Sequence, residues 1–172
     1  MKRVAASAAV VLALVVLVLP SSADDAPGCE GLGEYREAML EAAEPMVAFL
    51  DETGIVSASP LTISSNIWLA FSEEARAFNE RLLEIEPPEW AVEFHRLQLD
   101  TTGMQEQSAK AIVESGPMAV LIFEETINDI EERKDSVPAA IAETCPDFAQ
   151  FAADWDALDG EVDGTPVATP VR

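Results

Sequence analysis

This chain of 172 residues has little of what enzymes commonly use for catalysis. It contains one histidine, His95, and two cysteines. A single histidine excludes a two-histidine metal site, and Val92 stands where the Glu-x-x-His motif of di-iron bundles needs glutamate. The sequence also has no Gly-x-Ser-x-Gly elbow, no Walker loop and no Cys-x-x-Cys motif. We therefore predict a non-enzymatic protein with no catalytic residue and no cofactor, in which His95 is a structural residue hydrogen-bonded to a carboxylate at the core edge.

Basic residues are also scarce. The chain has 10 Lys and Arg residues and 32 Asp and Glu residues, so its formal net charge is −22. Such a surface repels nucleic acid phosphates and anionic lipid headgroups, and we expect binding to neither. It favours cations, basic partners or simple solubility. No motif identifies the partner, which is either a protein or a small molecule, and none indicates an oligomeric state.

The one long apolar run lies at the beginning of the chain. Lys2 and Arg3 precede the run 4–19, and small residues follow up to Ala23. This pattern is typical of a secretory signal peptide, here residues 1–23, and predicts a secreted or extracytoplasmic protein of the cell envelope. Two alternatives keep the domain outside the cytoplasm: an uncleaved anchor helix, for which the run is slightly short, and a lipid anchor on Cys29.

An exported protein can keep a disulfide, and Cys29 and Cys145 are the only cysteines. In an up-down-up-down bundle the start of the first helix and the end of the fourth lie at the same end. The two cysteines fall at those places. We therefore predict a disulfide between Cys29 and Cys145 that closes the bundle.

The spacing of apolar residues is helical nearly throughout, and no segment alternates as a strand does. The predicted fold is all-α: an up-down antiparallel four-helix bundle over residues 24–159, with a short C-terminal helix and a disordered acidic, Pro/Thr-rich tail over 160–172. Thr101-Thr102-Gly103 favours a bend in the third helix, with a full break as the alternative, and Asp135-Ser136-Val137-Pro138 is expected to interrupt the fourth. The second helix has two candidate starts, Ser59-Pro60 and Ser64-Ser65.

The third helix begins with Pro87-Pro88-Glu89-Trp90, which leads to Phe94-His95-Arg96-Leu97. This stretch of about a dozen residues resembles a pattern of small exported bacterial helical-bundle proteins. The resemblance implies the class of fold and carries no functional residue.

One acidic cluster matches part of a calcium-binding loop. Asp159, Glu161 and Asp163 stand at positions one, three and five, and a glycine follows at position six. Position twelve is Pro170, where an EF-hand needs a bidentate glutamate. The cluster is therefore either a calcium site that matches only part of an EF-hand loop or an acidic tail, and no other metal site is predicted.

Aromatic and methionine residues of the second and third helices, with small residues towards the end of the third, allow two interpretations; on the second helix they are Trp68, Phe71 and Phe78. At helical spacing they form either the core or one wall of a pocket between helices. The pocket candidates are Trp90, Phe94, His95, Thr101, Met104 and Ser108. We interpret the chain as an exported bacterial cell-envelope bundle with a binding or structural role, acting through its surface or an interhelical groove. The alternative is a module that senses or scavenges small molecules or metal ions.

Overall fold

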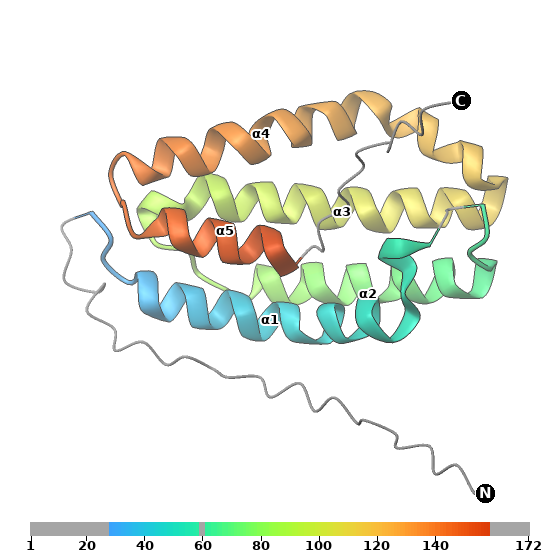
Figure 1. Cartoon of the computed structure of the whole chain (residues 1–172), viewed down its shortest axis with the longest axis horizontal. Coiled ribbons are helices and arrows are strands. Elements are labelled where there is room, and N and C mark those ends of the chain that lie inside the picture. Colours follow the sequence, from blue (N-terminus) through green and yellow to red (C-terminus); the bar gives the residue numbers. More distant parts are fainter. Residues whose placement is uncertain (1–27, 59–60, 159–172) are drawn as a thin grey trace, which may run out of the picture.

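The computed structural model describes residues 28–58 and 61–158. The predicted signal peptide, the tail and the calcium candidates Asp159, Glu161 and Asp163 lie outside these residues. Of the described residues, 84% are helical and none forms a strand, which confirms the all-α prediction. Five α-helices follow one another: α1 (Leu32–Thr53), α2 (Ser65–Leu83), α3 (Val92–Ser115), α4 (Glu124–Ala142) and α5 (Phe148–Leu158) (Figure 1). Three short 3₁₀ helices connect them: η2 (Ile55–Ser57), η3 (Glu89–Ala91) and η4 (Pro117–Phe123).

Local sequence signals explain how α1 ends and α2 begins. Gly54 adopts a left-handed conformation (φ 60°), and its N–H donates to the Leu50 carbonyl at 2.9 Å, which closes the last turn of α1. Ser64 caps α2, because its Oγ accepts a hydrogen bond from the Ile67 N–H at 3.4 Å. Of the two predicted starts of the second helix, the one at Ser64 is therefore correct.

Helix α3 runs without a break through Thr101, Thr102 and Gly103. The Thr101 hydroxyl donates to the Leu97 carbonyl at 2.8 Å, one turn earlier. Asn79 of α2 donates to the Leu99 carbonyl at 3.0 Å and to the Thr102 hydroxyl at 2.7 Å. These bonds from the neighbouring helix support the segment where helix propensity is lowest, so tertiary contacts outweigh propensity.

Helix α4 also continues through Asp135 to Pro138, so the predicted interruption there is wrong. Pro138 lies near the end of α4, where its missing N–H costs one hydrogen bond. Continuing the helix buries Ile141 on the far side of the proline, which compensates for that bond. The chain does change from 3₁₀ to α-helix before that point. The apolar run 118–123 lies in the 3₁₀ helix η4, and α4 begins directly after it at Glu124.

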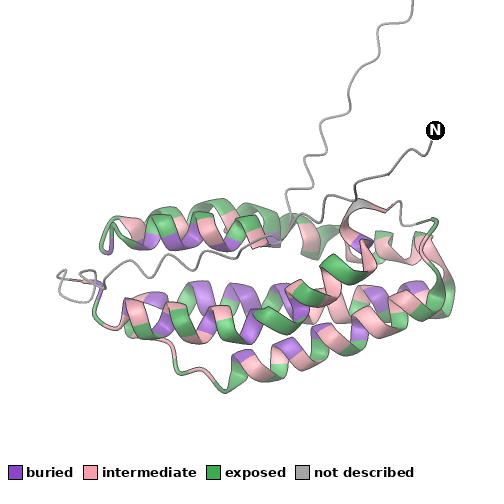
Figure 2. Ribbon diagram, turned by 60° about the horizontal axis from the view of Figure 1, so that its bottom comes forward, coloured by how far each residue is buried: buried purple, intermediate pink, exposed green. Residues whose placement is uncertain are grey.

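The helices pack in a ring in which each contacts the next, and α5 contacts both α4 and α1. In the view of Figure 1, α1 and α2 lie along the lower edge, α3 and α5 in the middle and α4 along the upper edge. Figure 2 shows that buried residues follow the inward faces of the helices. The short C-terminal helix α5 is thus part of the core.

Aromatic rings from α5 form the centre of that core. Phe148, Phe151 and Trp155 each pack against Phe94 of α3, with ring centroids 5.0, 5.8 and 6.2 Å away. Phe94 is 1% exposed. Edge-to-face packing of this kind adds to the free energy gained by burying the rings.

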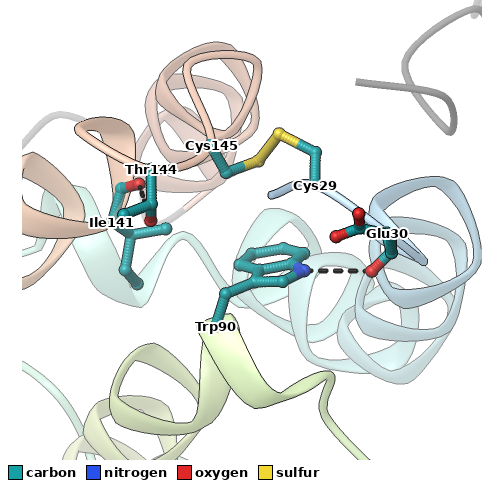
Figure 3. The surroundings of a disulfide bond; sticks show 6 residues. All are labelled: Cys29, Glu30, Trp90, Ile141, Thr144 and Cys145. Carbon is teal, nitrogen blue, oxygen red and sulfur yellow. Dashed lines mark hydrogen bonds between the residues drawn. A yellow bond between two sulfur atoms is a disulfide. The ribbon is translucent and has the colours of Figure 1, made fainter. Parts of the chain in front are cut away.

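The predicted disulfide between Cys29 and Cys145 is confirmed, with an S–S distance of 2.05 Å and both side chains fully buried. Figure 3 shows the indole of Trp90 close to it, where Trp90 Nε1–H donates to the Glu30 carbonyl at 3.0 Å. Gly28 has φ 91°, and a Cβ there would lie only 2.4 Å from the Thr144 carbonyl oxygen. Glycine therefore allows the two cysteine segments to approach each other.

Candidate functional site

A cavity of about 600 Å³ opens beyond the last turn of α5. With 11 residues α5 is about 17 Å long, whereas the 24 residues of α3 span about 36 Å. Over the described residues α5 reaches Leu158, and the other helices enclose the space beside its last turn. The lining comes from α1, η2, α2, α3, α4 and α5: Met46, Leu50, Ile55, Val56, Trp68, Phe71, Phe78, Gln98, Thr101, Thr102, Gln105, Glu131, Lys134, Asp135, Trp155 and Asp156.

The wall formed by α1, η2 and α2 is apolar and rich in aromatic rings. Trp68 and Phe71 pack edge to face with centroids 6.1 Å apart. Phe78 and Trp155 lie 6.3 Å apart at a tilt of 31°. An apolar wall with aromatic faces is typical of pockets for small organic molecules.

Trp68 differs from the other two tryptophans. The Nε1–H groups of Trp90 and Trp155 each donate a hydrogen bond at 3.0 Å, to the Glu30 carbonyl and to Gln98 Oε1. The Nε1 atom of Trp68 is buried and has no hydrogen-bond partner among the described residues. A buried donor without a partner costs about 1–3 kcal/mol.

The wall formed by α3 is polar, but its groups already make hydrogen bonds within the protein. Gln98 accepts from Trp155, and the Thr101 hydroxyl donates to the Leu97 carbonyl. The Thr102 hydroxyl donates to the Gln98 carbonyl at 3.0 Å and accepts from Asn79. Both threonine hydroxyls of this wall donate to backbone carbonyls one turn earlier in α3.

The rim of the cavity carries charged side chains from α4 and α5. Glu131, Asp135 and Asp156 contribute three negative charges and Lys134 one positive charge, which leaves a net charge of −2. Lys134 Nζ lies 3.6 Å from Glu131 Oε1. Partial burial raises the pKa of Asp156; Lys134 lowers this pKa, and Asp135 and Glu131 raise it further. The rim therefore has an excess of negative charge.

Of the six predicted pocket residues, Thr101 lines this cavity and the other five do not. Trp90, Phe94 and His95 belong to the core near the disulfide, because α5 packs against that half of α3. Met104 and Ser108 lie further along α3, and the Ser108 hydroxyl donates to the Gln105 carbonyl at 3.1 Å. Trp68, Phe71 and Phe78 of the second helix, for which the sequence left core and pocket wall open, do line the cavity.

His95 is structural, but its predicted carboxylate partner is wrong. Its side chain is buried, and its Nδ1 lies 3.3 Å from the Tyr35 hydroxyl. Burial lowers the pKa of His95, and a hydrogen bond with the Leu82 backbone raises it by less. Burial also raises the pKa of Tyr35 above its usual value. A neutral histidine therefore pairs with a neutral phenol inside the core.

The 3₁₀ helix η4 carries an exposed apolar surface at the end of α3, opposite the disulfide (Figure 1). None of its seven residues is buried. Met118, Leu121 and Ile122 are each more than half exposed, and the acidic residues Glu114 and Glu124 flank the segment. Contiguous apolar exposure of this kind is uncommon on soluble domains.

Two further searches concern the described residues only. Over 28–58 and 61–158, no helix has both the length and the apolar character needed to cross a bilayer. In the same part of the chain, no group of three or more His, Cys, Asp or Glu side chains is placed to hold a metal ion.

Comparison of the chain with protein-family models, curated proteins and solved structures found no match in any of the three. The interpretation of the cavity therefore depends on its own geometry and chemistry.

Proposed function

We propose that this chain is an exported, non-enzymatic binding protein of the bacterial cell envelope, in which an antiparallel up-down bundle holds a small organic molecule in the cavity beyond α5. The observation that carries the proposal is the cavity itself, about 600 Å³ with an aromatic wall. Small-molecule pockets in proteins have volumes of roughly 300–1,000 Å³ and apolar linings with a few polar groups. The cavity has this size, and half of its lining residues are apolar.

The polar groups of the cavity support binding over catalysis. Thr101 and Thr102 donate to backbone carbonyls, and Gln98 accepts from Trp155. A nucleophile needs a general base within hydrogen-bond reach, and neither threonine has one. Trp68 Nε1–H, by contrast, is a buried donor with no partner among the described residues.

A thermal-unfolding screen tests the proposal directly. The protein from Asp24 onward, with its disulfide oxidised, is heated with calcium, transition metals and a panel of small organic molecules. A molecule that binds only the native state raises the midpoint progressively with its concentration, because it adds about 2.7 kcal/mol of stability at a hundredfold excess over Kd. We expect organic molecules to do so.

A cavity-blocking variant shows whether such binding uses the cavity. Val56 lines the cavity, and Val56→Trp places an indole there. The matched control is Val92→Trp, at an exposed valine at the start of α3 that does not line the cavity. We expect the first variant to lose the ligand-induced shift and the second to keep it. Equal shifts in both variants would place the binding elsewhere, and a metal-only response would favour the metal-sensing alternative.

A further inference from the structure

The charged rim of the cavity lies close to its aromatic wall. Glu131, Asp135 and Asp156 exceed Lys134 by two negative charges at the rim. Lys134 lies 3.6 Å from Glu131 and also lowers the pKa of Asp156, so its one positive charge offsets only part of the negative charge, to which Asp135 and Asp156 contribute two carboxylates. These two carboxylates come from different helices, α4 and α5, so they approach the rim from two sides.

The aromatic wall also favours a ligand with a positive charge. Trp68, Phe71, Phe78 and Trp155 all line the cavity. The face of an aromatic ring carries partial negative charge and attracts ammonium groups, with tryptophan the most effective ring. An attraction of this kind is already present in the protein, where the Arg81 guanidinium lies 5.8 Å from the centre of the Phe78 ring. A carboxylate ligand would meet repulsion from the rim and from the ring faces.

We propose that the cavity selects organic cations, molecules with an apolar body that packs on the Trp68 and Trp155 wall and an ammonium group held at Asp135 and Asp156. This inference rests on the proposed function and specifies the class of ligand. The large negative charge of the whole chain favours the approach of such molecules and repels anions of the same shape. Partial burial raises the pKa of Asp156 although Lys134 lowers it, and a bound ammonium would further stabilise the ionised carboxylate.

Three probes with the same number of carbon atoms test the inference: phenylbutylammonium, phenylbutanol and phenylbutyrate. Their affinities for the oxidised protein are measured by calorimetry near neutral pH in about 0.15 M salt, where distant surface charges are largely screened. We expect the ammonium to bind at least about tenfold more tightly than the alcohol, and the alcohol more tightly than the carboxylate.

A charge-neutralising variant identifies the groups responsible. Asp135→Asn/Asp156→Asn leaves Glu131 and Lys134, whose charges cancel. We expect this variant to lose most of the preference for the ammonium while binding the alcohol unchanged. The control, Glu143→Gln/Asp147→Asn, removes two exposed carboxylates near the disulfide and is expected to retain the preference.

The outcomes separate the two proposals. If the alcohol or the carboxylate binds as tightly as the ammonium, selection of cations is wrong and binding in the cavity stands. If the ammonium is preferred equally in both double variants, the preference comes from the net charge of the chain and the assignment to Asp135 and Asp156 is wrong. If none of the three probes gives saturable binding, both proposals are wrong.

Discussion

Removing the disulfide should destabilise this protein severely without changing its folded structure. Cys29 and Cys145 are 116 residues apart in the sequence. In the chain-entropy model, closing a loop of that length restricts the unfolded chain by about 16 cal/mol/K, which corresponds to about 5 kcal/mol at 25 °C. Small domains have a total stability of roughly 5–15 kcal/mol, so the bond is a large share of it.

The folded state should survive because α5 is held by more than the disulfide. Phe148, Phe151 and Trp155 remain packed against Phe94 when the sulfur atoms separate. We therefore expect reduced protein to keep its helical circular dichroism at 25 °C. Its midpoint of thermal unfolding should fall by roughly 15–20 °C, from about 3–4 °C for each kcal/mol in a domain of this size.

The assay is urea unfolding of oxidised and reduced protein, followed by circular dichroism. The variant Cys29→Ala/Cys145→Ala provides a second comparison, and it should lose slightly more stability because it also removes buried atoms. A loss of less than about 2 kcal/mol on reduction would refute the loop-entropy argument. A marked loss of helix before unfolding would instead show that the disulfide holds α5 in place.

Two further predictions concern the core. Burial lowers the pKa of His95 from 6.5, so the unfolded chain binds a proton at this residue more readily than the folded protein does. The stability that neutral His95 contributes is therefore present above about pH 6.5 and is lost as the pH falls towards the lowered pKa of the folded state. Midpoints measured from about pH 7.5 to 5.5 should fall in the native protein and stay flatter in His95→Gln, and identical profiles would contradict this. Asn79→Ala should cost about 1–2 kcal/mol in urea unfolding, because two hydrogen bonds to α3 are lost, whereas Asn128→Ala, at an exposed site on α4, should cost less than about 0.5 kcal/mol. Equal effects would contradict the role of Asn79.

Apolar periodicity and cysteine position were sufficient to predict the helices and the disulfide. The stripe from Tyr35 to Met46 is buried as its spacing indicates, and Cys29 meets Cys145. Predictions of helix breaks failed because they depend on local propensity alone. Thr102 is supported by Asn79 from another helix, and burial of Ile141 favours continuing α4 past Pro138. Long-range contacts of this kind leave no signal in a short window of sequence.

The cavity was harder to predict because it depends on a difference in length between helices. Thr101 was a candidate since the third helix becomes smaller and more polar towards its end. The position of α5 decides the rest: it fills the core beside Phe94 and ends before Thr101 is covered. Trp90, Phe94 and His95 resemble pocket residues in sequence, yet they are core residues because α5 packs over them. Spacing along one helix cannot show which neighbour covers it.

The three tryptophans lie in three different environments, which makes the protein its own fluorescent reporter. Trp90 stands beside the disulfide, Trp155 in the aromatic core and Trp68 on the cavity wall. In a protein that keeps one tryptophan and has phenylalanine at the other two positions, emission reports on a single region. Reduction, global unfolding and ligand binding then give optical signals that can be timed separately. When the cavity fills, the environment of Trp68 and Trp155 changes, because both indoles line it, whereas Trp90 lies away from it.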